Sequence, residues 1–241
     1  LEEFKQDYEG VAWYGKKVTL PPELGGKTIR LHFEAVNYRS EVWVNGEAAG
    51  AHEGGYTGFD LEVGDLLYPD DENFIALRVI TPLITRNVVI DGLGKDDMPH
   101  WRGAISGGIW QSVSLIATDT VYIENVFANG DIGSGDVSIE VAIRNTSLTG
   151  QPVEIRWGIG SCEDSGVPVS STEMIALRPG INHLKKTIGV ENFKLWQLDD
   201  PHLYRLATTI MIEDQISDQV ETRFGFREFT VKGKHFYLNG K

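Results

Sequence analysis

Apolar and polar residues alternate along most of the chain, which is the pattern of β-strands that bury one face. In the segment TIRLHFEAV, residues 28–36, Ile29, Leu31 and Phe33 share one face and polar residues occupy the other. Gly, Pro, Asn and Asp clusters separate this segment from others with the same alternation, at residues 11–20, 41–46, 74–80 and 109–117. No segment has the spacing of an amphipathic helix, so the sequence predicts an all-β protein.

The stretch Glu41–Leu61 combines turn signals with aromatic residues. Asn45-Gly46 predicts a tight hairpin, because both residues accept the positive φ angles that such a turn needs. The members of this stretch that could face a ligand are then His52, Glu53 and Tyr56.

The alternation restarts after a polar joint at residues 118–120, which places a domain boundary near residue 119. Short strands then recur about every ten residues, as in an immunoglobulin-like sandwich of about 100 residues, although the Cys-Trp-Cys signature is missing. The inward positions of the first two strands are Val137, Ile139, Val141 and Ile143, followed by Val153, Ile155, Trp157 and Ile159.

Composition narrows the classes of function. The chain has 241 residues and a net charge of −13, which disfavours nucleic acid as a partner. No apolar run approaches the roughly 20 residues of a membrane-spanning helix. The single cysteine, Cys162, cannot form an internal disulfide, and the six histidines are scattered without an HExxH or CxxC motif, so we expect no metal site and no cofactor.

One long segment lacks alternation, at residues 81–108, and long loops in sandwich domains tend to be functional. It carries aromatic, carboxylate and guanidinium groups of the kinds that cover a sugar ring and bind its hydroxyls. These candidate residues are Asp91, Asp96, Asp97, His100, Trp101 and Arg102. A solvated loop or an interdomain contact would have the same composition, and both interpretations stay open at this point.

The order of several motifs resembles the non-catalytic front half of glycoside hydrolase family 2, which includes β-galactosidases, β-glucuronidases and β-mannosidases. The similarity runs colinearly through nearly the whole chain. The motifs that carry it are AWYGKKVTLP, FEAVNYRSEVWVNGEAAGAHEGGYTGFDLEV, SGGIWQSVSLI, LWQLDDPHLYRLATTI, RFGFREF and FYLNGK.

This resemblance implies a jelly-roll (galactose-binding-like) sugar-binding domain at residues 1–118 and an immunoglobulin-like sandwich at 119–229. Residues 230–241 would begin the linker into a (β/α)₈ barrel that carries both catalytic glutamates, so no residue here is expected to be catalytic. The sequence lacks an initiating methionine and ends in a turn motif, and we expect it to be cut from a larger protein at both ends.

The family also implies roles for particular residues. In its β-galactosidase-like members, the loop before GGIW holds an aspartate followed closely by methionine, tryptophan and arginine, and reaches the substrate. DDMPHWRGAISGG matches this pattern, with Asp96 and Asp97 competing for the aspartate position. The predicted substrate-binding residues are therefore Asp91, Asp97, His100, Trp101 and Arg102. The resemblance assigns Arg223, Phe226 and Arg227 of RFGFREF to packing at the barrel interface.

Three functional hypotheses follow. The first is the N-terminal portion of a retaining glycoside hydrolase for terminal β-linked sugars, inactive alone, whose partners are the sugar substrate, the catalytic barrel and possible further copies of the chain. The second is a stand-alone carbohydrate-binding module, and the third is a pair of purely structural sandwich domains. Localisation stays open, and a bacterial periplasmic or extracellular setting is permitted without being required.

Overall fold

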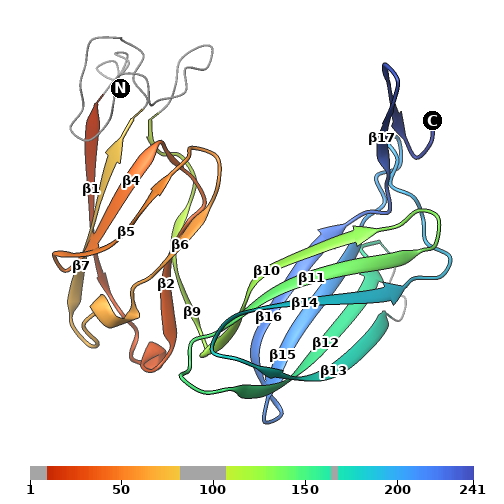
Figure 1. Cartoon of the computed structure of the whole chain (residues 1–241). Helices are drawn as coiled ribbons and strands as arrows, with labels where there is room; N and C mark the ends of the chain where they lie inside the picture. The colour runs from red at the N-terminus through yellow and green to blue at the C-terminus, as the bar shows by residue number, and fades with distance from the viewer. Residues whose placement is uncertain (1–9, 82–106, 164–167) are drawn as a thin grey trace. The chain divides into compact units, whose positions relative to one another are not determined.

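A computed structural model describes residues 10–81, 107–163 and 168–241 (Figure 1). The chain divides into two compact units, Leu1–Ala117 and Thr118–Lys241. Strands make up nearly all the regular structure, and the described residues contain two short 3₁₀ helices, η1 (Pro22–Leu24) and η2 (Gly64–Leu66), but no α-helix. The prediction of an all-β protein built from β-sandwiches is confirmed.

The first unit is a sandwich of antiparallel sheets. One sheet has the order β1-β7-β4-β5, made of β1 (Val11–Thr19), β7 (Glu72–Ile80), β4 (Arg39–Val44) and β5 (Glu47–Glu53). The opposing sheet has the order β6-β2-β9, made of β6 (Phe59–Glu62), β2 (Thr28–Phe33) and β9 (Val113–Thr118). A short pair, β3 (Val36–Asn37) with β8 (Gly108–Ile109), lies outside these two sheets.

Alternate residues of both sheets fill the core of the first unit. Leu31 and Phe33 of β2 are each 2% exposed, and Leu77 and Val79 of β7 belong to the same buried cluster. The polar positions His32 and Arg78 between them are only partly buried, as the alternation in the sequence requires, whereas Arg30 is buried and lies 3.6 Å from Asp60.

The turn at Asn45-Gly46 joins β4 to β5, with φ angles of 52° and 86°. The predicted hairpin is therefore confirmed. The Asn45 amide also donates to the side-chain oxygen of the buried Asn73 over 2.7 Å, and Asn73 in turn binds the backbone of Tyr68 and Asp71. Asn73 thus connects the hairpin to the loop before β7.

The second unit is a separate sandwich. One sheet has the order β10-β11-β14, made of β10 (Val121–Gly130), β11 (Asp136–Asn145) and β14 (Gly180–Gly189). The other has the order β13-β12-β15-β16, made of β13 (Val169–Leu177), β12 (Gln151–Ser161), β15 (Tyr204–Ile212) and β16 (Gln215–Phe224). A two-stranded hairpin, β17 (Phe229–Lys232) and β18 (His235–Leu238), follows.

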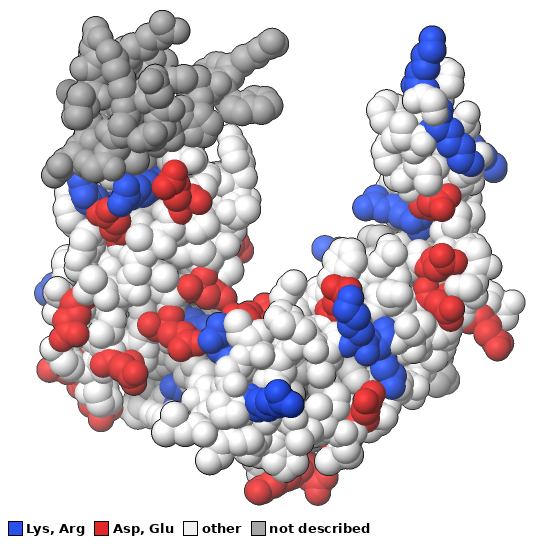
Figure 2. Space-filling view, in the orientation of Figure 1, with Lys and Arg blue, Asp and Glu red and all other residues white. Residues whose placement is uncertain are grey.

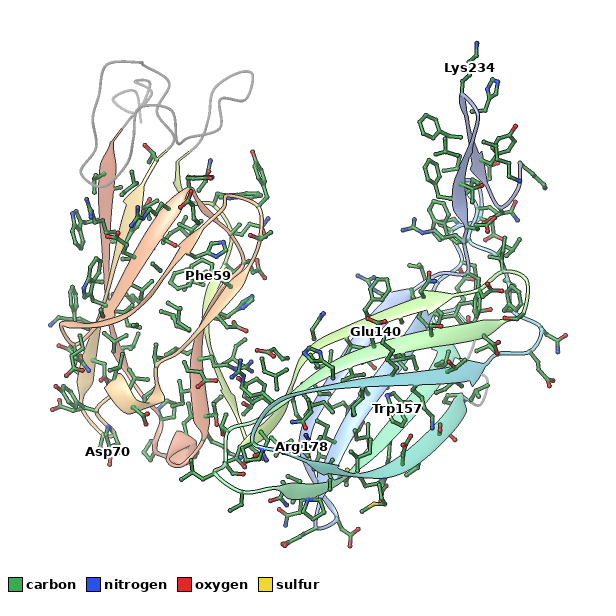
Figure 3. The ribbon with its side chains drawn as sticks, in the orientation of Figure 1. Phe59, Asp70, Glu140, Trp157, Arg178 and Lys234 are labelled. Carbon is green, nitrogen blue, oxygen red and sulfur yellow. The ribbon has the colours of Figure 1, made fainter. Side chains whose placement is uncertain are left out.

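The predicted inward positions of this unit are confirmed. All eight of those residues in β11 and β12 are at most 2% exposed and belong to one hydrophobic cluster. Figure 3 labels Trp157, which packs in that cluster between the two sheets.

Two expectations need correction. Residues 109–117 form two strands, β8 and β9, because Trp110 and Ser112 are held by long-range contacts: the Trp110 indole donates to the Gly55 carbonyl, and the Glu34 amide donates to the Ser112 carbonyl. Phe226, which we expected at a domain interface, is fully buried, and its ring contacts Phe193 at a centroid distance of 4.3 Å. It is a core residue of the second unit.

The negative net charge is spread over the surface. On the face shown in Figure 2, Asp and Glu side chains are dispersed over both units and interspersed with Lys and Arg. Charge alone therefore marks no site on this face.

Candidate functional site

The predicted substrate-binding residues cannot be placed. Asp91, Asp97, His100, Trp101 and Arg102, together with the competing Asp96, all fall in residues 82–106, outside the described residues. Their assignment stays a prediction. The described residues on either side of this segment do, however, define a location in the first unit.

The two ends of the segment adjoin other parts of the first unit. Thr81, which follows β7, is buried, and its hydroxyl donates to the Gly10 carbonyl over 3.1 Å. At the other end Gly108 pairs with Asn37, which joins β8 to β3. β8, paired with β3, is therefore the described strand that follows residues 82–106 along the chain.

Aromatic and polar side chains gather beside this pair of strands, and we call Asn37, Tyr38, Glu53, Tyr56 and Trp110 the β3–β8 cluster. The Trp110 indole donates to the Gly55 carbonyl over 2.7 Å, and the rings of Tyr56 and Trp110 meet edge to face with centroids 5.7 Å apart. Tyr56 is 82% exposed and Trp110 is 46% exposed. Exposed ring faces beside an amide and a phenol can cover the apolar side of a sugar and bind its hydroxyls.

The Tyr38 hydroxyl forms a hydrogen bond with the Glu53 carboxylate. Burial, the hydrogen bond to the Glu53 carboxylate and the negative charge of that carboxylate all raise the pKa of Tyr38. The phenol therefore keeps its proton throughout the neutral range, where it acts as a hydrogen-bond donor. The cluster can bind a neutral polar ligand, but this phenol supplies no base.

His52 has a structural role instead. Its ring stacks on Phe59 at 4.2 Å, Phe59 stacks on Phe33 at 4.7 Å, and the Thr57 hydroxyl lies 3.2 Å from His52 Nε2. Of the three residues singled out in the stretch Glu41–Leu61, Tyr56 and Glu53 are exposed, and Glu53 hydrogen-bonds to Tyr38.

Asn37 and Trp110 were missed as site residues by the sequence analysis. Trp110 sits in the motif SGGIWQSVSLI, which served there only as a mark of family resemblance and of a strand. Asn37 follows Val36 at the end of an alternating segment, where nothing local distinguishes it. Their association depends on the pairing of β3 with β8, which are far apart in the sequence.

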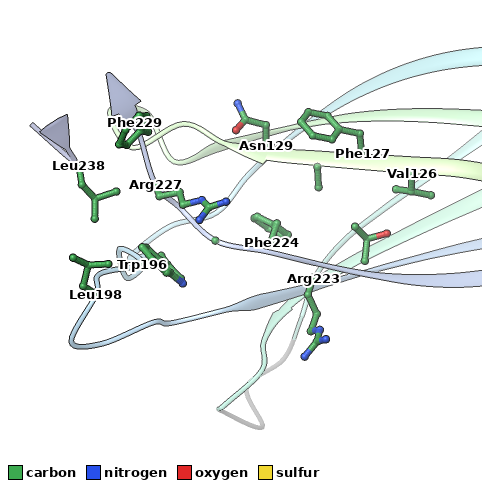
Figure 4. A pocket seen from close by; sticks show the side chains of 13 residues that line it. Val126, Phe127, Asn129, Trp196, Leu198, Arg223, Phe224, Arg227, Phe229 and Leu238 are labelled. Carbon is green, nitrogen blue, oxygen red and sulfur yellow. The ribbon is translucent and has the colours of Figure 1, made fainter. Parts of the chain in front are cut away.

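A concave feature lies in the second unit, and we call it the Trp196 pocket (Figure 4). It has a volume of about 820 Å³. The Arg227 guanidinium lies 5.1 Å from the centre of the Trp196 ring, a cation–π contact. Phe127, Leu198 and Phe229 also line it, although each is more than half exposed. Exposed apolar side chains grouped with arginine are typical of surfaces that contact protein.

The described ranges also bear on metal and membrane binding. There, no three His, Cys, Asp or Glu residues are grouped so that they could hold a metal ion. Within the same ranges, none of the helices has the length and apolar character to span a membrane.

Gly55→Ala is expected to destabilise the β3–β8 cluster. An added methyl group at position 55 would lie 2.4 Å from Asn37 Oδ1 and 2.8 Å from its Cγ, so either Asn37 or the loop must move. We expect the free energy of unfolding to fall by about 1–3 kcal/mol in a thermal or urea titration. Gly64→Ala is the matched control, because its methyl would lie 3.7 Å from the nearest atom. Equal stability of the two variants would show that Gly55 does not fix Asn37.

Comparison with family models gives a match in each unit. The model described as "Glycosyl hydrolases family 2, sugar binding domain" matches residues 2–119, and the model described as "Glycosyl hydrolases family 2" matches residues 121–227. The two matches follow one another and cover nearly all of the chain.

Curated relatives extend well beyond the matched part. A β-galactosidase of Thermoanaerobacterium thermosulfurigenes is 30% identical over 223 residues, which are 89% of this chain and 30% of the relative. A β-galactosidase of Thermoanaerobacter pseudethanolicus is 28% identical over 98% of this chain and 31% of its own length. The chain thus spans about a third of the length of these relatives.

Solved structures share the fold. A crystal structure from Bacteroides fragilis that carries a provisional β-galactosidase name matches with a TM-score of 0.82 and 30% identity, over 97% of this chain and 35% of the other. The Bacteroides uniformis β-glucuronidase also gives a TM-score of 0.82, at 24% identity, over 97% of this chain and 28% of the other.

Proposed function

Because the chain belongs to glycosyl hydrolase family 2, we propose that its two sandwiches form the non-catalytic N-terminal portion of a retaining glycoside hydrolase. The observation that carries this proposal is the order of the two family matches, combined with relatives that are about three times longer. In this proposal the catalytic glutamates lie in a barrel domain, and no residue of the two units takes part in bond cleavage.

The proposed substrate is a terminal β-linked sugar, with a β-galactoside as the first choice. Two relatives named β-galactosidase are 30% identical to the chain. Two others with that name are 26% and 28% identical, within the range of 25–28% spanned by relatives named β-glucuronidase. Steady-state kinetics of the whole enzyme with a β-galactoside and with a β-glucuronide test the choice of substrate.

We place the first unit beside the substrate. The barrel loops of such an enzyme form a pocket that is open on one side, and a neighbouring domain that covers it removes water from around the sugar. Asp91, Asp97, His100, Trp101 and Arg102 are the proposed contacts. The exposed rings of Tyr56 and Trp110 support this placement, because they lie beside β8, the strand that follows those five residues in the sequence.

The second unit is proposed to support the barrel. The Trp196 pocket supports this role, because residues from the end of β16 and from the hairpin of β17 and β18 line it. Its exposed apolar side chains could contact a partner domain. Arg227 stacks on Trp196 there, which leaves the guanidinium edge available for hydrogen bonds across an interface.

A carbohydrate-binding module is the second candidate function, and the exposed pair of Tyr56 and Trp110 favours it. In this case the 241-residue chain alone would bind a β-galactoside with an affinity equal to that of the whole enzyme. If the chain instead plays a purely structural role, neither the chain nor its cluster variants would affect sugar binding.

Trp101→Ala in the whole enzyme is expected to raise KM for a nitrophenyl β-galactoside about tenfold, because a stacking surface for the sugar is removed. Steady-state kinetics measure this effect, with Tyr68→Ala, an exposed aromatic in the same unit, as the control. Unchanged kcat and KM in Trp101→Ala would contradict the site assignment. Separately, release of nitrophenol by the purified 241-residue chain would contradict the proposal that the two units are non-catalytic.

A further inference from the structure

The outer face of the β1-β7-β4-β5 sheet carries three aromatic rings that do not contribute to the core. Trp13 of β1 is 63% exposed, Phe74 of β7 is 47% exposed, and Trp43 of β4 is partly exposed. Neither the β3–β8 cluster nor the Trp196 pocket includes any of them. Groups of large apolar rings exposed to water are typical of surfaces that bind a ligand or a partner, so this face is a candidate binding surface.

The two tryptophans meet above the strand that separates them. β7 lies between β1 and β4 (Figure 1), so the outer strands are about 10 Å apart. The ring centroids of Trp13 and Trp43 are nevertheless only 5.4 Å apart, with an angle of 32° between the ring planes. Both side chains therefore lean inward over β7 and form one shallow surface.

Small residues make room for this surface. Gly15, Ala76 and Trp43 are register partners across the three strands, so a glycine and an alanine lie in the same row as the Trp43 ring. The Phe74 ring covers Gly15, because a methyl group added there would lie 2.8 Å from Phe74 Cζ. We call Trp13, Trp43 and Phe74, with Gly15 and Ala76 between them, the Trp13–Trp43 platform.

Ion pairs border the platform at two ends. Glu41 accepts from Arg78 at 2.9 Å and from Arg39 at 3.2 Å, and Lys17 pairs with Glu72 at 2.7 Å. Arg78 is the register partner of Trp13, and Lys17 is the register partner of Phe74. Because these charges are already paired with one another, the edge of the platform has no excess of positive or negative charge that would attract a charged partner. Its side chains can still form hydrogen bonds with a neutral ligand.

We propose that the Trp13–Trp43 platform binds the pyranose rings of a neutral, β-linked glycan chain. The apolar faces of the sugar rings would stack on the indoles and on Phe74, and their hydroxyls would reach Arg78, Glu41 and Arg39. The shallow angle between the rings suits an extended, ribbon-like chain, which is the shape that equatorial β-linkages produce. The description of residues 2–119 as a sugar binding domain is consistent with this ligand class.

This inference does not depend on the proposed function, because the platform and the β3–β8 cluster have no residue in common. Titration calorimetry of the 241-residue chain with cellohexaose and with β-1,4-linked mannohexaose, both of which have equatorial linkages at C1 and C4, tests it. We expect saturable binding of at least one of them, and an affinity about tenfold weaker for Trp13→Ala, since one stacking face is removed. Trp13→Phe is expected to keep part of the affinity, because it keeps an aromatic face.

Control variants separate the platform from other surfaces. Tyr68→Ala removes an exposed ring outside the platform and should bind like the wild type. If Trp110→Ala abolishes binding and Trp13→Ala does not, the β3–β8 cluster is the glycan site and the platform inference is overturned, while the proposed function stands. A thermal melt of each variant checks that the fold is intact, which is expected for Trp13 because this side chain lies largely in solvent on an edge strand.

Three other results would also overturn the inference. The first is absence of binding to both β-linked hexasaccharides, and the second is equal binding of the α-linked maltohexaose, which would contradict the linkage preference. The third is a dimer in sedimentation velocity that Trp13→Ala dissociates in a chain that binds no glycan. In that case a second copy of the chain would be the occupant of the platform.

Discussion

Replacing Phe226 with alanine is expected to lower the free energy of unfolding of the second unit by about 3–5 kcal/mol. Phe226 is fully buried, and its ring contacts Phe193 at 4.3 Å, Tyr204 at 5.1 Å and Phe224 at 5.7 Å. Truncation would therefore leave a cavity among three aromatic rings and would remove their mutual contacts.

Differential scanning calorimetry can measure this effect, because the units have separate hydrophobic clusters and their transitions can be followed individually. Phe229→Ala is the matched control. Phe229 is 67% exposed, so its truncation should change the stability by no more than about 0.5 kcal/mol. If Phe226→Ala were as mild as Phe229→Ala, the placement of Phe226 in the core would be wrong.

The second large effect is expected for Asn73→Ala, which should destabilise the first unit by about 3 kcal/mol. The fully buried Asn73 side chain accepts from the Asn45 amide and the Tyr68 backbone, each over 2.7 Å. It also donates to the carbonyls of Tyr68 at 3.0 Å and Asp71 at 3.1 Å. Alanine would leave these buried partners without their hydrogen bonds.

Urea titration with hydrogen exchange at residues 45–50 and 68–73 would measure both the loss and its location. Asn73→Asp would set a buried carboxylate oxygen against the carbonyls of Tyr68 and Asp71 in place of the donating amide, so a loss at least as large as that of Asn73→Ala is expected. Asp71→Ala is the control and should be nearly neutral, because it removes an exposed side chain that accepts from the adjacent Glu72 amide but keeps the backbone carbonyl to which Asn73 donates. A loss in Asn73→Ala no greater than that in Asp71→Ala would contradict the connecting role of Asn73.

Local alternation predicted the strands well because each sandwich buries one face of each strand. Ile139 and Ile155 show this, since their neighbours are polar and both are at most 1% exposed. The same reasoning failed at Trp110, because what breaks the strand there is a hydrogen bond to Gly55, which is remote in sequence. Phe226 was misassigned because a family motif indicated the region but not the direction in which the ring points.

The candidate site was less accessible to sequence reasoning. Composition singled out the segment with Asp97 and Trp101, but it could not show which parts of the fold lie beside the ends of that segment. The pairing of Asn37 with Gly108, the indole bond from Trp110 to Gly55 and the contact of Trp13 with Trp43 all arise from strand order. The order of strands in a sheet depends on how whole sheets pack, so it cannot be predicted from a short sequence motif.

The contact between Gly130 and Phe226 bears on how this sequence can evolve. A methyl group at position 130 would lie 2.5 Å from Phe226 Cδ1, so any larger residue there requires a smaller side chain at position 226. A smaller side chain at 226 would, in turn, leave a cavity unless position 130 or a neighbour grew to fill it. The two positions should therefore covary among related sequences, with glycine at one accompanying an aromatic residue at the other.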